Sequence, residues 1–132
     1  MPDRRAAVAG SALFVLVAGA VLWPPGAVYW TALAAVVGDG PTLAVVALLG
    51  GVAGATFVRV TGVSGADLAR GALVAYVLGM AAIEASTSPD SPVHLLGYAA
   101  LAGCLVGGGA LAARVRSAPA GQSGAAPDDG RQ

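Results

Sequence analysis

The chain has 132 residues, of which 57% are hydrophobic and only 11% are charged, and its formal net charge at pH 7 is zero. Soluble domains carry about 25% charged residues, so this chain cannot cover a core with a water-exposed surface. A zero net charge also argues against the basic patch that would neutralise nucleic-acid phosphates, so no nucleic-acid partner is expected. The length leaves room for one domain.

The apolar residues fall into blocks close to the ~20 residues that a helix needs to cross the hydrocarbon of a bilayer. These blocks are apolar on every face, whereas a transmembrane barrel requires alternating apolar and polar residues. We therefore predict an all-α polytopic membrane protein, with a transmembrane domain at 1–116 and a disordered cytoplasmic tail at 117–132. Its four transmembrane helices should form two hairpins, at about 6–23, 42–60, 68–85 and 93–113.

The first span follows a pair of arginines and ends at Pro24-Pro25, because consecutive prolines cannot continue the backbone hydrogen bonds of a helix. The small residues at 18–20 are typical of a signal-peptide cleavage site, which leaves a cleaved leader as the alternative. The apolar run continues past them through Val21 and Leu22, and this favours a retained helix.

A short apolar segment at 27–37 follows, which as a helix is roughly 16 Å long, or about half of a membrane. We expect an interfacial or re-entrant helix here, with both alternatives open. Trp23, Tyr29 and Trp30 would form a local aromatic belt that holds it at the headgroups.

Turn-forming residues separate the remaining spans. Gly38 to Pro41 should close the short helix, with Pro41 in the first turn of the second span. The polar stretch at 59–70 should contain the central loop between the second and third spans, where Asp67 is a candidate cap for the third span. The stretch at 86–92, which is rich in serine and proline, should be the second outer loop.

The arginines predict the orientation. All seven basic residues are arginines, and three pairs of them mark successive helix ends on one side of the predicted bundle, whereas the opposite ends carry only acidic residues. Under the positive-inside rule both termini and the central loop lie in the cytoplasm, and the protein is a multi-pass protein of the cell membrane. The pairs are Arg4 and Arg5, Arg59 and Arg70, and Arg114 and Arg116.

A polar cluster of Glu84, Asp90 and His94 lies near the predicted outer surface. Ionisable residues at membrane depth often belong to an ion or proton pathway. Helical phase favours a simpler role, because Glu84 lines up with bulky residues of its span and His94 lines up with Leu101 and Leu105. We expect these side chains to anchor lipid-facing helix ends at the headgroups. No catalytic, cofactor or metal site is expected, since one histidine and two carboxylates at this spacing are a poor metal signature.

Small residues recur at a spacing of four in three spans, and such rows let helix backbones approach closely in lipid. In the fourth span a second row, Ala100, Cys104 and Gly108, widens the face. We expect this face to pack within the bundle or against a second copy, and Leu101 and Leu105 to face lipid. The principal rows are Gly50 and Gly54, then Gly71, Ala75 and Gly79, then Ala99, Gly103 and Gly107.

Lysine and asparagine are absent, while alanine, glycine and valine are abundant, which is typical of a GC-rich genome. In composition and layout the whole chain resembles the small uncharacterised membrane proteins of haloarchaea. The segment 50–55, followed by Arg59, also resembles the first helix of the small four-helix fluoride channels. That resemblance implies a pore asparagine, which has no counterpart in this chain.

The central polar groups of the spans are Ser11, Thr56 and Tyr76, and lone hydroxyls of this kind usually bond to the backbone of their own helix. We therefore expect a non-enzymatic structural or accessory subunit of a larger assembly. The alternative is a small transporter or channel that works as an oligomer. The expected partners are the lipid bilayer and a second copy or another membrane protein.

The predicted orientation is tested by thiol labelling of intact cells in a Cys104→Ala background. A cysteine at Gly65 should stay unlabelled by an impermeant reagent, because the central loop is expected in the cytoplasm, whereas a cysteine at Ser88 should react. Labelling at Gly65 with silence at Ser88 would reverse the topology.

Overall fold

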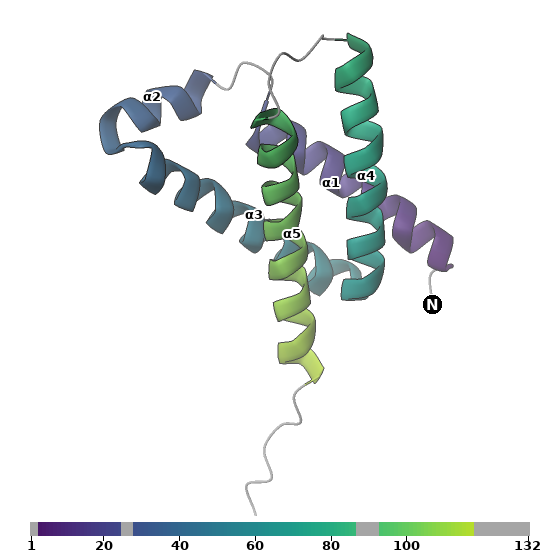
Figure 1. Ribbon diagram of the computed structural model, residues 1–132. Helices are drawn as coiled ribbons and strands as arrows, with labels where there is room; N and C mark the ends of the chain where they lie inside the picture. Colours follow the sequence, from purple (N-terminus) through teal and green to yellow (C-terminus); the bar gives the residue numbers. More distant parts are fainter. Residues whose placement is uncertain (1–2, 25–27, 87–92, 118–132) are drawn as a thin grey trace, which may run out of the picture.

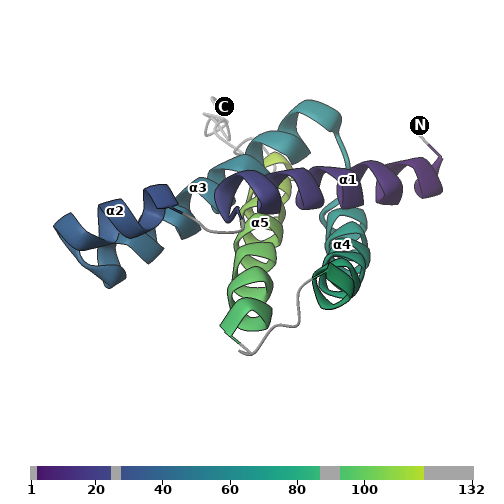
Figure 2. The same ribbon diagram turned by 90° about the horizontal axis from the view of Figure 1, so that it is seen from above.

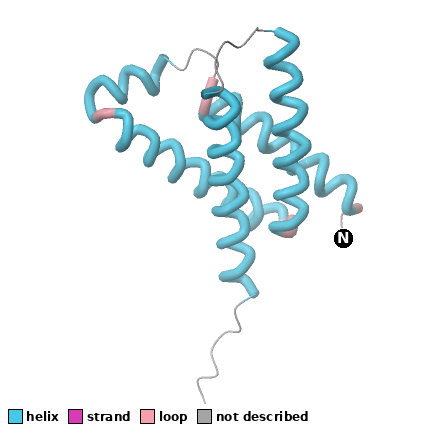
Figure 3. Tube along the Cα trace, viewed as in Figure 1, coloured by secondary structure: helices cyan, strands magenta, loops and turns pink. Residues whose placement is uncertain are grey.

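The computed structural model describes residues 3–24, 28–86 and 93–117. Helices account for most of these residues, with short loops between them (Figure 3) and no strand in the described ranges. Four of the helices are long and apolar enough to cross a membrane. The predicted all-α polytopic membrane fold is therefore confirmed. The helices are α1 (Arg4–Leu22), α2 (Val28–Val37), α3 (Asp39–Thr61), α4 (Gly65–Ser86) and α5 (Val93–Ser117).

Three predicted boundaries need correction. Gly38 to Pro41 is not a loop, because α3 already begins at Asp39 and only Gly38, with φ +90°, separates it from α2. Pro41 fits in the first turn of α3, where its missing N–H would have no intrahelical partner. At the other end of the chain α5 continues to Ser117, beyond the predicted end of the fourth span at residue 113, and residues 118–132, where a disordered tail was predicted, lie outside the described residues.

The central loop is also shorter than the 61–67 that the predicted spans leave between them. Residues 62–64 alone connect α3 to α4, and Arg59 and Arg70 lie within helices, as the predicted spans have them. Gly62 ends α3 in the left-handed conformation at φ +71°, which glycine adopts without a steric penalty, and its N–H bonds to the carbonyl of Val58. Asp67 is not the cap, since it lies in the first turn of α4.

Two of the long helices, α1 and α3, cross α4 and α5 steeply, whereas α4 and α5 run in similar directions. Figures 1 and 2 show α1 and α3 passing behind α4 and α5 in the first view and across them in the second. The most extensive contacts join α3 to α5 and α1 to α4. In chain order α1 and α3 form the first hairpin, and α4 and α5 form the second. The most extensive packing nevertheless joins each helix to a helix of the other hairpin.

The spacing of the buried residues explains this geometry. Helices that interlock along ridges of every fourth residue cross at about −50°, whereas a repeat of 3.5 residues gives a nearly parallel bundle. The buried positions of α1 and α3 follow the spacing of four. They are Ala7, Ser11, Ala12, Val15 and Gly19 in α1, and Thr42, Val46, Gly50, Gly54 and Val58 in α3.

The α3–α5 crossing is a backbone-to-backbone contact that glycine permits. A Cβ atom on Gly54 would lie 2.7 Å from the carbonyl carbon of Leu105 and would overlap its oxygen. A Cβ on Gly108 would lie 2.6 Å from the carbonyl carbon of Gly51. At Gly50 the nearest atoms would be the side chains of Leu101, at 3.1 Å, and Cys104, at 3.3 Å. Any larger residue at Gly54 or Gly108 must therefore push the two helices apart.

The α1–α4 crossing is built in the same way around Gly71. A Cβ there would overlap the side chain of Ser11 and lie 2.7 Å from the backbone nitrogen of Ala12. Ala75, 2% exposed, continues the buried row, and Gly79 lies farther out, where its Cβ would be 3.6 Å from Leu16. The small residues of α4 thus face α1.

In α5 the buried face differs in part from the one that helical phase predicted. Cys104 and Gly108, from the second row of small residues, contact α3. Leu101 and Leu105, expected to face lipid, are 4% and 0% exposed. The side chain of Leu101 packs at Gly50 of α3, and the backbone of Leu105 lies against Gly54. The row Ala99, Gly103 and Gly107 is exposed and does not pack within the described chain. The face of α5 that packs within the chain therefore contains Leu101, Leu105, Gly108 and Gly109, and Gly103 lies outside it.

The core centres on Leu68, Val58 and Leu105, all with 0% exposure, where α3, α4 and α5 meet. Gly109 makes room for this cluster, since a Cβ there would overlap Leu68 and lie 2.9 Å from Val58. Outside the core, large apolar side chains point away from the protein, such as Leu48 at 68% and Leu73 at 66% exposure. That arrangement suits a protein surrounded by lipid.

Neighbouring glycines in α5 provide a matched test of the crossing. Gly108→Ala should lower the melting temperature in detergent, because separating the helices costs about 1–3 kcal/mol. Gly107→Ala should be neutral or slightly stabilising, because no heavy atom lies within 4 Å of its Cβ position and alanine favours a helix over glycine by about 0.5–1 kcal/mol. Equal melting of the two variants would contradict the crossing.

Candidate functional site

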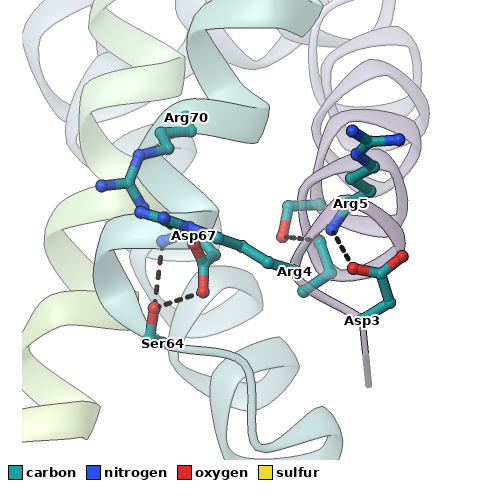
Figure 4. A network of polar contacts seen from close by, with 8 residues as sticks. Asp3, Arg4, Arg5, Ser64, Asp67 and Arg70 are labelled. Atoms are coloured by element: carbon teal, nitrogen blue, oxygen red, sulfur yellow. Dashed lines mark hydrogen bonds and ion pairs between the residues drawn. The ribbon is translucent and has the colours of Figure 1, made fainter. Parts of the chain in front are cut away.

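A cluster of charged and polar side chains joins the N-terminal ends of α1 and α4. Asp67 Oδ1 lies 2.8 Å from Arg70 Nη1, on its own helix, and 3.5 Å from Arg4 Nε, on α1. Figure 4 shows Arg4 reaching across to Asp67 between the two helices. The Asp67 carboxylate is mostly shielded, with 18% of its side chain exposed, whereas the arginines are 50% exposed or more. Asp67 therefore holds two guanidinium groups near the surface.

Ser64 fixes the position of Asp67. Its hydroxyl donates to Asp67 Oδ2 at 2.7 Å and accepts the Asp67 backbone N–H at 3.1 Å. Ser64 is thus the residue that caps α4, and Asp67 occupies the third helical position, as the acidic residue of a capping box does. The predicted cap, Asp67, lies three residues after the actual one, Ser64. Both residue types are good helix caps, so the sequence alone does not distinguish between them.

Asp3 performs the equivalent role for α1. Its carboxylate accepts the backbone N–H of Arg5 at 3.3 Å, which satisfies one of the free donors at the start of the helix. Figure 4 shows the Arg5 side chain directed away from Asp67. The cluster therefore contains three guanidinium groups and two carboxylates, and it carries a positive excess.

At the opposite end, three aromatic side chains satisfy the last carbonyls of α1. Pro24 and Pro25 have no N–H to donate, so the carbonyls of this turn need other partners. Tyr29 Oη donates to the carbonyl of Val21, Trp30 Nε1 to Leu22, and Tyr98 Oη to Trp23 at 2.8 Å. The first two donors come from α2 and the third from α5, so α1 ends where three helices meet.

A cavity of about 180 Å³ lies between α1, α4 and α5 beside this end. Its walls are apolar except for the hydroxyls of two tyrosines, and both hydroxyls already donate to carbonyls: Tyr98 to Trp23, and Tyr76 to Leu95 at 3.3 Å. An apolar cavity of about 150 Å³ is large enough to hold benzene. The cavity between α1, α4 and α5 can therefore accommodate an apolar group, and none of its lining residues is charged.

Three hydroxyls of α1 and α3 bond to the backbone four residues earlier in the chain. Ser11 donates to the carbonyl of Ala7, Thr42 to Gly38 and Thr61 to Phe57, at 2.7–2.8 Å. Within the described ranges, no buried side-chain nitrogen or oxygen lacks a hydrogen-bond partner. No group of three metal-binding side chains occurs there either.

Of the three residues in the predicted polar cluster, the structure describes the side chain of Glu84 alone. Glu84 is exposed near the end of α4. Asp90 lies outside the described residues, and so does the side chain of His94, whose backbone belongs to α5. Cys104 is half-buried and packs against Gly50.

Two features escaped sequence reasoning. The contact between Asp67 and Arg4 joins residues far apart in the chain, so no local pattern indicates it. The sequence did indicate a need for the aromatic donors, because Pro24 and Pro25 lack the backbone N–H groups that would otherwise bond to the carbonyls at the end of α1. An aromatic belt was predicted at Tyr29 and Trp30, but Tyr98 was not assigned to it.

Comparison with protein-family models, curated proteins and solved structures gives no match to this chain.

The role of Tyr98 is tested by removing one hydroxyl. Tyr98→Phe should lower stability in detergent by about 1 kcal/mol, since the carbonyl of Trp23 loses its donor in a partly buried site. Tyr76→Phe is the matched control on the other wall of the cavity, and its longer, exposed hydrogen bond predicts a smaller effect. Thermal unfolding of both variants provides the comparison, and a larger loss at Tyr76 would contradict the assignment.

Proposed function

We propose that the protein is a non-catalytic accessory or structural subunit, which associates with another transmembrane helix through the outer face of α5. The observation that carries the proposal is the row Ala99, Gly103 and Gly107. All three residues are exposed, and no heavy atom lies within 4 Å of a Cβ position on Gly103 or Gly107. Because Gly103 and Gly107 have no side chains, another helix can approach the backbone of α5 closely at this outer face.

Energetics support a partner at this face. A glycine inside a helix costs about 0.5–1 kcal/mol relative to alanine. Gly54 and Gly108 have a compensating role inside the chain, because their helices touch there. Gly103 and Gly107 have no such role within the described residues. A second helix that approaches closely would gain van der Waals contacts and offset this cost.

The favoured partner is a second copy of the chain or a membrane protein with a similar row of small residues. The alternative of a small transporter or channel needs groups that replace the hydration shell of a substrate. In this chain Ser11 and Thr42 already bond to their own helices, which favours the accessory role.

We also place the termini in the cytoplasm and the protein in the cell membrane. The N-terminal end of α1, the α3–α4 connection and the C-terminal end of α5 lie toward the lower side of Figure 1. These are the ends that carry the arginine pairs, and arginine is enriched in cytoplasmic segments. The composition of the chain, which lacks lysine and asparagine and is rich in alanine, glycine and valine, supports a relationship to the small membrane proteins of haloarchaea.

The association is tested with two glycines of α5 that lie on different faces. Gly103→Leu should shift the protein to a smaller species in mild detergent, as measured by size-exclusion chromatography with light scattering. Gly97→Leu is the matched control, because its Cβ position also has no neighbour within 4 Å. Thermal stability of the isolated chain should be unchanged in both variants.

The outcomes separate the proposals. An unchanged complex in Gly103→Leu, or equal dissociation in Gly97→Leu, would contradict association through this face. Ion or solute flux in vesicles that contain the purified protein, abolished by Gly103→Leu, would favour the oligomeric transporter or channel.

A further inference from the structure

A shallow groove of about 400 Å³ runs beside the crossing of α1 and α4, at the end of the molecule that carries the charged cluster. Its walls combine two chemistries. The side chains of Arg4 and Arg5 line one end, and the rest of the lining is apolar and comes from both helices. The apolar lining consists of Val8, Ala9, Ala12 and Val74.

The steep crossing accounts for the groove. The helices touch at Gly71, Ser11 and Ala12, and they must diverge on either side of that contact. The groove is the space that opens between the two helices toward the start of α1. Val8 and Ala9, which have short side chains, line it there. In a bilayer such a space is filled by hydrocarbon, because an empty apolar void loses dispersion contacts.

The charged end of the groove suits an anion. Arg4 contacts Asp67 through Nε and Arg70 contacts it through Nη1. A guanidinium has five N–H donors, so each keeps donors for a further acceptor. Arg5 also lines the groove, and in Figure 4 its side chain is directed away from Asp67, so its guanidinium group is not held by that carboxylate. Planar guanidinium groups match the geometry of phosphate oxygens.

We propose that this groove binds one anionic phospholipid, with its phosphate at Arg4 and Arg5 and one acyl chain along Val8, Ala9 and Val74. Asp67 serves as a positioning residue, because it holds Arg4 toward α4. The proposal is independent of the association through α5, which uses another helix and another face.

The test measures lipid retained by the purified protein, with dioleoyl phosphatidylglycerol and dioleoyl phosphatidylcholine as probes and native mass spectrometry as the readout. The wild-type protein should retain phosphatidylglycerol preferentially. Arg4→Gln with Arg5→Gln should lower that preference about tenfold, since each arginine near an anionic lipid surface contributes substantially to binding. Arg5→Gln alone provides a second variant that leaves the Arg4–Asp67 ion pair intact.

Arg114→Gln with Arg116→Gln is the matched control, because it removes the same charge from the end of α5. The control should retain the wild-type preference, and an equal loss there would show diffuse attraction between the protein and anionic lipid, which overturns the site. Ala9→Trp keeps every arginine and fills the groove, so it should also lower retention of phosphatidylglycerol. Full retention by Ala9→Trp, or displacement of the lipid by millimolar inorganic phosphate, would overturn the acyl-chain position.

Discussion

The fold depends on backbone contact between crossed helices. In lipid the hydrophobic effect does not drive helices together, so close packing and hydrogen bonds must hold them. Gly54 and Gly108 allow α3 to touch α5, and Gly71 allows α1 to touch α4. Because the buried residues repeat every four positions, the helices cross steeply and meet over a short length. The remaining contacts, including the Phe14–Phe57 stack with ring centroids 4.2 Å apart, are arranged around these two crossings.

Crossed helices leave divergent ends, and each end of the protein is closed by different chemistry. At the arginine-bearing end, Asp67 bridges α4 to Arg4 of α1. At the other end, Tyr29, Trp30 and Tyr98 donate hydrogen bonds to the last carbonyls of α1. In an apolar medium an unsatisfied carbonyl is costly, so donors from α2 and α5 fix the end of a helix that prolines have interrupted.

The two proposed interactions follow from what these crossings leave exposed. The inner face of α5 contains Leu101 and Leu105, and Gly103 and Gly107 lie on the outside. The crossing of α1 and α4 opens a groove beside Arg4 and Arg5. One surface offers close backbone approach and suits a helix, whereas the other combines positive charge with an apolar floor and suits a lipid.

The sequence by itself determined the number of long helices, their approximate limits and the short helix before α3, because length, apolar composition and proline or glycine positions are local properties. The packing role assigned to Leu105 was wrong, since both faces of α5 contain residues compatible with packing, and only the position of α3 decides which face is buried. The same holds for Arg4 and Asp67 and for Tyr98 and Trp23, pairs that meet from different helices. Local pattern thus decided which segments are helical, and tertiary structure decided which of their faces meet, because a helix presents every face and its neighbours select one.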